Sequence, residues 1–262
     1  MTIHPTAIVE DGAEIANGVI IGPHCIVGAG AKLRDGVILK SHVVIDGDTT
    51  IGARAIVHPF AVLGGPPQHL HYKGEATRLE IGADVIIREH VTMNLGTPAG
   101  GGVTRIGDRG FFMTASHVAH DCQVGDDVIF ANNATLGGHV TVENSAFLGG
   151  LCAIHQHCRI GAYAFVGGCA AVACDVIPYA SAFGNHARLG GLNVIGMKRR
   201  NMSRESIRAL REAYRLIFEG EEGTFRDRLE AARTKFVDNA EVKRIIDFID
   251  NGAARSLMTP VR

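Results

Sequence analysis

A period of six residues runs through most of this sequence and constrains its fold more than any other feature. An apolar residue, termed an anchor here, recurs at every sixth position from Ile3 to Leu63 and again from Ile106 to Val172. An amphipathic helix repeats its apolar residues every 3.6 positions and a half-buried strand every 2. Neither element explains a period of six, so the repeat itself must define the architecture.

Small or medium-sized residues stand four positions after the anchors, as at Ala7, Cys25 and Ala61. Hexapeptide periodicity is typical of a parallel β-helix, and the pattern resembles the left-handed kind, in which three hexads make one triangular coil. Neighbouring coils of such a prism pair as strands about 4.8 Å apart. We therefore predict a mainly β fold, a left-handed parallel β-helix of hexapeptide repeats over residues 1–185, with the anchors stacked inside.

Two segments interrupt the repeat. The stretch GGPPQHLHYKGEATR covers residues 64–78, and NLGTPAGGG covers residues 94–102. Because the hexad resumes after each of them, we predict that both segments leave the prism as loop insertions.

Beyond residue 200 the apolar spacing becomes helical. It predicts helices over 203–220 and 241–252, and a third that starts at Thr224, where Thr224 and Asp227 have the spacing of a capping box. Residues 186–262 are therefore predicted to form a connecting and α-helical C-terminal domain.

Charge and apolar patterning exclude several classes of protein. The formal net charge is −1 and the charged residues are dispersed, whereas a nucleic-acid-binding domain usually has a clustered basic surface. No apolar run reaches membrane-spanning length, and the first residues do not have the pattern of a secretory signal. Six cysteines, none in a C-x-x-C pair, suit a reducing compartment. We expect a cytoplasmic protein without a nucleic-acid partner or a membrane span.

The stretch SHVAHDCQVG places His117, His120, Asp121 and Cys122 within six positions. In the hexad frame His120 points outward with Asp121 beside it, and His117 belongs to the end of the preceding face, near the corner. Cys122 takes a small-residue position and is expected to point into the core. Three further cysteines take equivalent positions: Cys25, Cys152 and Cys158.

Residues that lie one coil apart should emerge one above the other on the same face. His139 and His155 are therefore expected on the face of His120, in successive coils. Three interpretations follow from such a column: polar outer-face residues without a task, a tetrahedral zinc site with an open position, or a general base, His120, oriented by Asp121. The spacing alone leaves all three open.

Several motifs closely resemble those of the UDP-N-acetylglucosamine acyltransferase family. They are SHVAHDC (116–122), ANNATLGGHVTV (131–142), AIHQHCRIGAYAFVGG (153–168), GNHA (184–187), MKRR (197–200) and both interruptions of the repeat. The resemblance runs essentially from end to end, including the helical tail. The hexad alone would equally fit acetyltransferases, a sugar N-acyltransferase of the same pathway or a trimeric carbonic anhydrase.

The resemblance implies a homotrimer with active sites in the clefts between subunits. It also implies transfer of a 3-hydroxyacyl chain from acyl carrier protein to the glucosamine 3-hydroxyl of UDP-N-acetylglucosamine, the first step of lipid A biosynthesis. The carrier thioester is a co-substrate, and no cofactor or metal is expected. Because the carrier protein is acidic, Arg and Lys side chains of the tail are expected docking contacts.

The same resemblance implies roles for individual residues. His120 would be the general base, Asp121 would hold its ring, and the backbone N–H of Gly138 would stabilise the oxyanion. The acceptor or thioester site would be lined by His117, His139, His155 and Gln156, and approached by the loop residues Gln68, His69 and His71. The uridine and pyrophosphate would be bound by Asn193, Arg199 and Arg200. The acyl chain would pass Gly168 and end near His186.

Two departures from the family pattern leave the acceptor atom open. His69 and His71 stand where the family usually has an acidic and a basic residue, and Ile195 stands where it commonly has an acidic one. N-acyl transfer to a 3-amino analogue of the sugar nucleotide is therefore an alternative to O-acyl transfer. Less favoured alternatives are a zinc carbonic-anhydrase-like β-helix enzyme and a non-catalytic scaffold.

Overall fold

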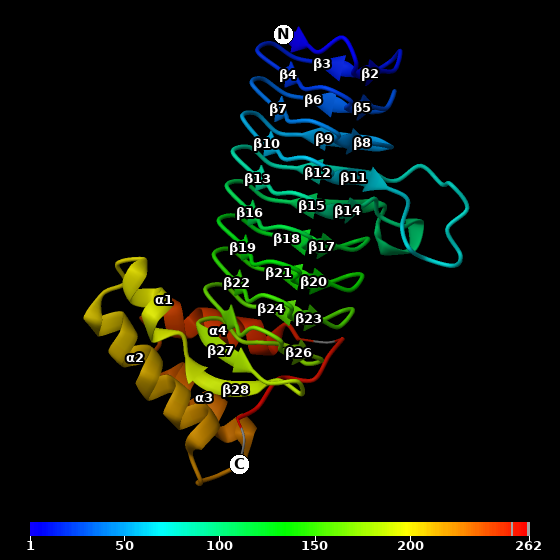
Figure 1. Cartoon of the computed structure of the whole chain (residues 1–262). Coiled ribbons are helices and arrows are strands. Elements are labelled where there is room, and N and C mark those ends of the chain that lie inside the picture. The colour runs from blue at the N-terminus through cyan, green and yellow to red at the C-terminus, as the bar shows by residue number, and fades with distance from the viewer. Residues whose placement is uncertain (253, 261–262) are drawn as a thin grey trace.

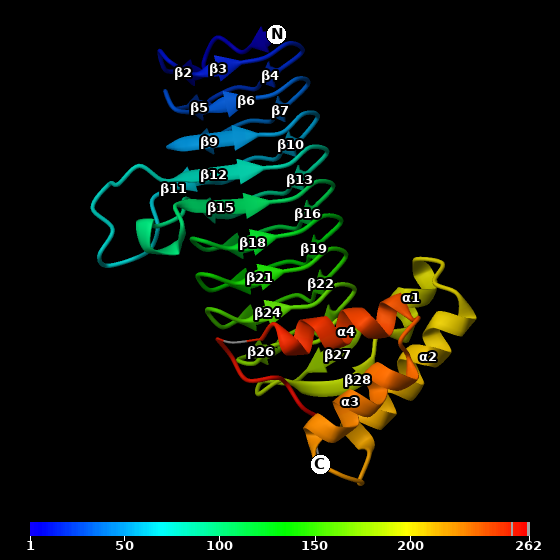
Figure 2. The same cartoon turned by 180° about the vertical axis from the view of Figure 1, so that it is seen from behind.

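The anchors point into a triangular prism of stacked coils, which the computed structural model describes over residues 1–252 and 254–260. The prism runs from the N-terminus at one end to four helices packed at the other (Figure 1; Figure 2 from behind). It is a left-handed parallel β-helix with a C-terminal helical segment, which confirms the predicted fold class.

Three sheets, termed A, B and C, form the faces of the prism, and successive strands of each coil visit A, then B, then C. Sheet A contains β1 (Thr2–Ile3), β4 (Ile20–Ile21), β7 (Ile38–Leu39), β10 (Ile56–Val57), β13 (Ile86–Ile87), β16 (Phe111–Phe112), β19 (Ile129–Phe130), β22 (Phe147–Leu148), β25 (Phe165–Val166), β27 (Ala180–Phe183) and β28 (Arg188–Leu192). Sheet B contains β2 (Ile8–Val9), β5 (Ile26–Val27), β8 (Val44–Ile45), β11 (Val62–Gly65), β14 (Thr92–Asn94), β17 (His117–Val118), β20 (Thr135–Leu136), β23 (Ala153–Ile154) and β26 (Ala171–Val172). Sheet C contains β3 (Glu14–Ile15), β6 (Lys32–Leu33), β9 (Asp48–Ile51), β12 (Arg78–Ile81), β15 (Val103–Ile106), β18 (Gln123–Val124), β21 (Thr141–Val142) and β24 (Arg159–Ile160).

Tight turns connect the faces, and their conformation decides where corner side chains lie. At most corners a residue takes a left-handed backbone conformation; Asp121 has φ 62°, His139 φ 60° and His157 φ 65°. Non-glycine residues adopt this conformation rarely, and here the hydrogen-bonded coils on both sides impose it. Asp121, His139 and His157 therefore form one column at the corner between sheets B and C.

The outward surfaces of the three sheets differ in polarity. The first residue of each two-residue strand faces outward, and on sheet C these residues include Lys32, Gln123 and Arg159. On sheets A and B they are mostly apolar, and Ile8 and Ile20 remain 59% and 44% exposed. Large contiguous apolar surface on a single chain indicates an interface, so sheets A and B have the character of covered faces.

Both interruptions of the repeat fall between strands of successive faces. Residues 66–77 form the loop between β11 and β12, and residues 95–102 connect β14 to β15 through the short turn η1 (Pro98–Gly100). The two insertions project from the same side of the prism (Figure 1).

The tail contains α1 (Val194–Arg199), α2 (Arg204–Tyr214) with the π-helical turn η2 (Arg215–Glu219), α3 (Phe225–Lys235) and α4 (Ala240–Asp250). The predicted capping box of Thr224 and Asp227 is present at the start of α3. The antiparallel pair of β27 and β28 and the short helix α1 were not predicted. Within the described chain, no helix has the length and apolarity needed to cross a membrane.

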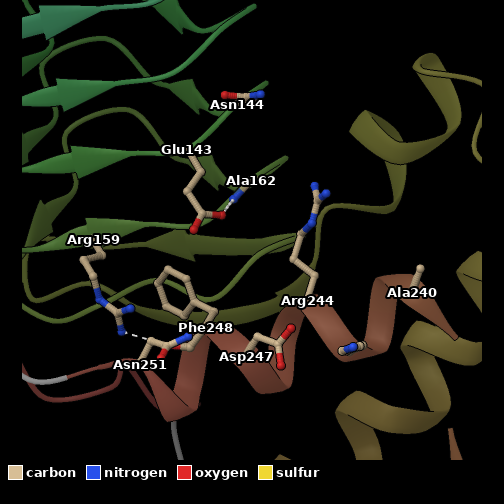
Figure 3. Close-up of a pocket in the computed structure, with 10 residues that line it drawn as sticks. Glu143, Asn144, Arg159, Ala162, Ala240, Arg244, Asp247, Phe248 and Asn251 are labelled. Atoms are coloured by element: carbon tan, nitrogen blue, oxygen red, sulfur yellow. Dashed lines mark hydrogen bonds between the residues drawn. The ribbon is translucent and has the colours of Figure 1, made fainter. Parts of the chain in front are cut away.

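Arg159 attaches this tail to the prism. Its guanidinium donates to the buried Asp175 at 2.7 Å and to the carbonyl of Phe248 in α4 at 3.0 Å, and it lies 4.1 Å above the Phe248 ring. A groove of about 570 Å³ remains between α4 and sheet C (Figure 3). None of the site residues predicted from sequence lines it.

Candidate active site

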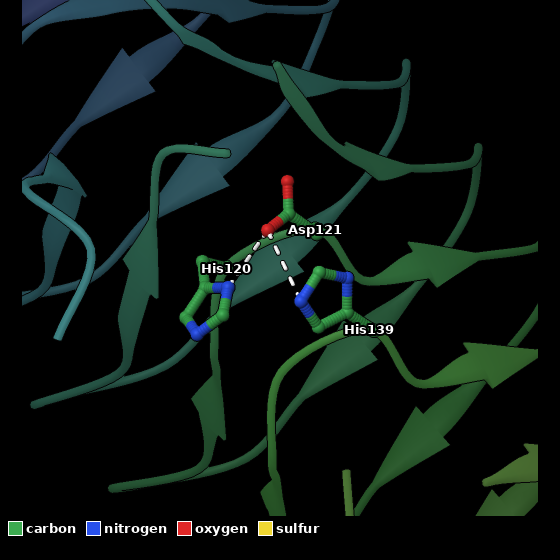
Figure 4. A group of neighbouring side chains, drawn as sticks. All are labelled: His120, Asp121 and His139. Atoms are coloured by element: carbon green, nitrogen blue, oxygen red, sulfur yellow. Dashed lines mark hydrogen bonds and ion pairs between the residues drawn. The ribbon is translucent and has the colours of Figure 1, made fainter. Parts of the chain in front are cut away.

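His120 and Asp121 form a buried pair at the corner between β17 and β18. The Nδ1 atom of His120 lies 2.7 Å from Oδ2 of Asp121, and the two residues are 9% and 4% exposed (Figure 4). An acceptor at Nδ1 favours the tautomer that carries its proton there. The Nε2 atom, for which no hydrogen bond is found in the described structure, then has a free lone pair.

Gly138 lies directly against His120, one coil further along. A Cβ atom at Gly138 would lie 2.7 Å from Nε2 of His120, so a side chain there would fill the space at this nitrogen. The amide at this corner position makes no hydrogen bond in the backbone ladder, and other coils satisfy it with a side chain, as Asp126 does for Asp108 N–H. Over the described residues no acceptor is found for the Gly138 N–H, which leaves a donor beside the His120 ring.

His139 completes the group on the same corner. Its Nε2 atom lies 3.7 Å from Oδ2 of Asp121, and its ring stands perpendicular to that of His120 with 5.1 Å between centroids. Burial lowers the pKa of His139 below its usual value of 6.5, while Asp121 opposes this shift and the neighbouring histidines add to it. At neutral pH the His139 ring is therefore a neutral hydrogen-bonding group.

The prediction that His155 continues the column of His120 and His139 is wrong. Register pairing of Leu136 with Ile154 puts His155 in the column of Gly137, which is one position before the column of His120. The histidine ring below His139 belongs to His157, which the sequence analysis did not select. Its corner position, 18 residues after His139, was the signal that could have identified it.

His155 is held by the C-terminal tail instead. Arg255 Nη2 donates to Nδ1 of His155 at 2.7 Å, and its Nε donates to the carbonyl of Gln156 at 2.9 Å. Asp175 pairs with Leu257 in this tail, so residues distant in sequence meet beneath the prism. Arg255 is a second residue that sequence analysis missed, because the contact spans 100 positions without any local pattern.

His117 also lies elsewhere than predicted. It belongs to β17, next to Val118 on sheet B, and not to the preceding face. Its Nδ1 atom lies 2.7 Å from the hydroxyl of Thr92 in the coil above. Burial lowers the pKa of His117, and proximity to His120 lowers it further.

The loop between β11 and β12 brings His69 to His120. The rings of His69 and His120 meet edge to face with 5.3 Å between centroids, and His71 lies 5.7 Å from His69 in the same way. His69, His71 and the neighbouring Gln68 are exposed. The loop therefore places exposed polar groups at the mouth of the site.

The residues predicted to bind the uridine and pyrophosphate lie at a different corner, between sheets C and A. Arg199 and Arg200 line a groove of about 560 Å³ that runs between α1 and the aromatic outer surface of sheet A. Arg200 donates to the carbonyl of Asp127, in the same coil as His120. Asn193 also lines the groove, but its side chain accepts from Gly196 N–H and donates to Tyr163, so it caps α1. Ile195 is exposed there.

Gly168 and His186 lie near the base of the prism. Gly168 is exposed at the corner that follows β25, and His186 is exposed in the turn between β27 and β28. Backbone bonds tie this turn to the last coil, from Ala171 to Gly184 and from Ala187 to Ala171.

His120, Asp121 and His139 offer ligand atoms close enough together to hold a metal ion. However, Asp121 already accepts hydrogen bonds at both oxygens, from the backbone and hydroxyl of Thr97 and from His120. Metal binding would have to replace these bonds, so the donor set suits a hydrogen-bonded dyad better than a metal centre. The four cysteines predicted to point inward are buried.

Comparison with known proteins gives a consistent result over the whole chain. A family model described as "Udp N-acetylglucosamine O-acyltransferase; Domain 2" matches residues 175–258. The acyl-[acyl-carrier-protein]--UDP-N-acetylglucosamine O-acyltransferase of Caulobacter vibrioides is 57% identical over 262 residues, covering 100% of this chain and 99% of that protein. The enzyme of that name from Agrobacterium fabrum is 49% identical, covering 99% and 96%.

Solved structures agree with these relatives. The UDP-N-acetylglucosamine O-acyltransferase of Moraxella catarrhalis superposes with a TM-score of 0.95 at 42% identity, covering 98% of this chain and 100% of that one. The UDP-N-acetylglucosamine acyltransferase of Campylobacter jejuni gives 0.93 at 34% identity, covering 99% and 100%.

Proposed function

This chain belongs to the UDP-N-acetylglucosamine O-acyltransferase family, and from that membership we propose that it transfers an acyl chain from acyl carrier protein to UDP-N-acetylglucosamine with His120 as the general base. The chain transferred is a 3-hydroxyacyl group and the acceptor is the glucosamine 3-position, which makes this the first step of lipid A biosynthesis. The observation that carries the assignment is the 2.7 Å bond from His120 to Asp121 beside the unpaired Gly138 amide.

The reaction balances with these residues alone. Nε2 of His120 accepts the proton of the sugar hydroxyl while that oxygen attacks the thioester carbonyl. The Gly138 N–H stabilises the oxyanion, the C–S bond breaks, and the imidazolium returns its proton to the leaving thiolate. While the His120 ring carries the extra proton, the carboxylate of Asp121 stabilises its positive charge. A base of this kind typically contributes about 10²–10⁴-fold.

Oxygen is the favoured acceptor atom because the relatives that cover the whole chain are named O-acyltransferases. His69 contacts His120 and so can select the acceptor at the mouth of the site. An assay with purified protein that compares 3-hydroxy and 3-amino sugar nucleotides separates the two alternatives. Faster turnover of the 3-amino sugar nucleotide would show that the enzyme forms an amide, and N-acyl transfer would then replace O-acyl transfer as its reaction.

A homotrimer is supported by the outer surfaces of the prism. At the corner between sheets A and B, the rings of His24, His42, Phe60 and His90 stack at 4.9–5.0 Å, flanked on both sides by apolar strands. If these corners meet at a three-fold axis, sheet A of one subunit faces sheet B of the next. Such a heterologous contact joins two different surfaces, and three subunits related by a three-fold rotation close it into a ring.

The trimer also explains why the predicted site is divided between two corners. His120 lies at the corner between sheets B and C, whereas Arg199 and Arg200 lie at the corner between C and A, level with it. Around a three-fold axis, these two corners of neighbouring subunits flank the same outer cleft. Arg200 of one subunit would then bind the pyrophosphate of a nucleotide whose sugar meets His120 of the next.

The acyl chain fits the lower part of the same cleft. Outward residues of sheet B become small there, at Thr135, Ala153 and Ala171. Sheet A presents the stacked rings of Phe147 and Phe165 to the opposite side. A chain that runs between them would reach Gly168 and His186.

The free cysteines support a reducing compartment, and we propose that the enzyme acts in the cytoplasm. Exposed basic residues of the tail, such as Arg204 and Arg208, suit an acidic carrier protein.

Substitution His120→Ala tests the central assignment. Transfer should fall by at least about 10²-fold while the melting temperature and the oligomeric mass stay unchanged. The control is Asp11→Ala, an exposed change at the corner between β2 and β3, which is remote from the site and from the ring stack. An active His120→Ala protein would remove His120 from the mechanism.

A further inference from the structure

The insertion between β14 and β15 reaches back to the dyad through Thr97. Its backbone N–H donates to Oδ1 of Asp121 at 2.7 Å, and its hydroxyl donates to Oδ2 at 2.7 Å. Oδ2 is the same oxygen that lies 2.7 Å from Nδ1 of His120. Thr97 is 3% exposed, so this network is closed to water on the side of the insertion.

Packing of the insertion reinforces these bonds. The Thr97 hydroxyl accepts from Gly100 N–H at 3.3 Å and so closes the short turn η1. Gly100 lies against the carboxylate of Asp121 so closely that a Cβ atom there would overlap it. From the other side, Asp121 N–H donates to the hydroxyl of Thr104 at 2.8 Å. The carboxylate is therefore bonded through both oxygens and enclosed by backbone.

We propose that Thr97 is a positioning residue for acyl transfer, which acts through Asp121 to hold the His120 ring; this rests on the proposed role of His120. A carboxylate turns easily, because the last torsion of Asp is broad and roughly two-fold. Two donors from one residue fix the plane of the carboxylate, with Oδ2 directed at Nδ1. That arrangement keeps the proton on Nδ1 and the lone pair of Nε2 toward the substrate.

The position of Thr97 explains why the hexad is interrupted in the coil that precedes that of His120. The insertion follows β14, and β14 pairs with β17, the strand directly before the proposed base. From there it supplies Asp121 with two donors from outside the repeat.

Substitution Thr97→Val in the full-length protein removes the hydroxyl donor and keeps the backbone donor and the branched shape. We expect kcat to fall by about 10- to 100-fold, as for other residues that orient a functional side chain, while KM for UDP-N-acetylglucosamine stays within about two-fold. Thr97→Ser keeps the hydroxyl and should restore most of the activity. Pro98→Ala, an exposed change in the same turn, is the matched control and should retain wild-type kcat.

A double-mutant cycle separates positioning from a general effect on the loop. In an Asp121→Ala background Thr97 has no carboxylate to hold, so Thr97→Val should change kcat by less than about two-fold. Losses that multiply in the double variant would overturn the proposal, and so would wild-type kcat in Thr97→Val.

Failure of this proposal is distinguishable from failure of the proposed base. An active His120→Ala protein contradicts the base. An inactive His120→Ala protein combined with a fully active Thr97→Val protein contradicts the role of Thr97 alone. Gly100→Ala provides a second route, because it forces the carboxylate to move without removing a donor, and it should reproduce the loss in kcat.

Discussion

The imidazole ring of His157 stacks on that of His139, with 4.5 Å between ring centroids and 8° between ring planes. Because His139 in turn faces Asp121, this stack connects an exposed histidine at the corner to the buried dyad.

Replacing His157 should change the titration of His139. A protonated His157 ring is one of the charges that lower the pKa of His139. In His157→Phe the stacked shape remains and the charge is lost, so the pKa of His139 should rise toward its usual value. An NMR titration of the His139 ring proton measures this, with Asp11→Asn, an exposed change near the N-terminal end of the prism, as a control that leaves His139 unchanged. An unaltered His139 titration in His157→Phe would show that the stack carries no electrostatic coupling.

Acid should destabilise the fold through the buried histidines. Burial lowers the pKa of His117 and His139 in the folded state, so the unfolded chain binds more protons below about pH 6.5. Their contribution to the free energy of unfolding is complete above that pH and is lost as the pH falls through it. Melting temperatures measured from pH 8 to pH 5 should therefore decline, and His117→Gln should reduce the slope. An equal slope in this variant would assign the decline to other groups.

The hexad predicted the solenoid because its period is a direct consequence of the coil geometry: anchors such as Leu136 and small residues such as Cys122 must alternate in a fixed phase to fill the prism. The same count failed for His155. At a corner the chain turns within two or three residues, so a difference of one position along the chain places a side chain in another column. His157, rather than His155, therefore lies next to His139.

Contacts outside the repeat could not be predicted from its period. Arg255 and Thr97 reach the site from the tail and from an insertion, and no local pattern specifies where such segments return to the prism. Likewise β27 and β28 leave the parallel order because they follow the last complete coil and cover its end. The family resemblance predicted the residues of both corners and sites in the clefts between subunits, and the apolar outer surfaces of sheets A and B indicate which faces of the prism would meet.

Gly138 should tolerate no side chain. A Cβ atom there would lie 2.5 Å from Cε1 of His120, so Gly138→Ala must displace the ring. We expect kcat/KM to fall by at least about 100-fold, comparable to the loss of an oxyanion donor, with a melting temperature close to wild type. Gly28→Ala is the matched control, since Gly28 lies at the same corner of an earlier coil, between β5 and β6, and a Cβ atom there would approach Ile45 O at 3.3 Å. Equal activity of both variants would contradict close packing of Gly138 against the base.

Arg255 should affect the site through His155 and Gln156. Arg255→Met keeps the length of the side chain but removes both donated hydrogen bonds. Exposed bonds of this kind contribute about 1 kcal/mol each at most, so we expect KM for acyl carrier protein to rise by about three- to ten-fold with little change in kcat. Steady-state kinetics with varied donor measures this. Arg34→Met, the same exposed change near the N-terminal end of the prism and far from the tail, serves as the control. An unchanged KM for acyl carrier protein in Arg255→Met would show that Arg255 contributes only to the packing of the tail.

Mixed trimers can test whether one active site uses two subunits. His120→Ala and Arg200→Ala chains should each be inactive or weak alone, since every cleft of either homotrimer lacks one partner. When the two are unfolded together and refolded as an equal mixture, a cleft is intact only if its base comes from an Arg200→Ala chain and its arginine from a His120→Ala chain. Random assembly into a closed ring then restores about a quarter of the clefts, and activity should recover to about a quarter of that of identically treated wild type. Recovery cannot occur if His120 and Arg200 of the same chain serve one site, because each chain carries one of the two defects.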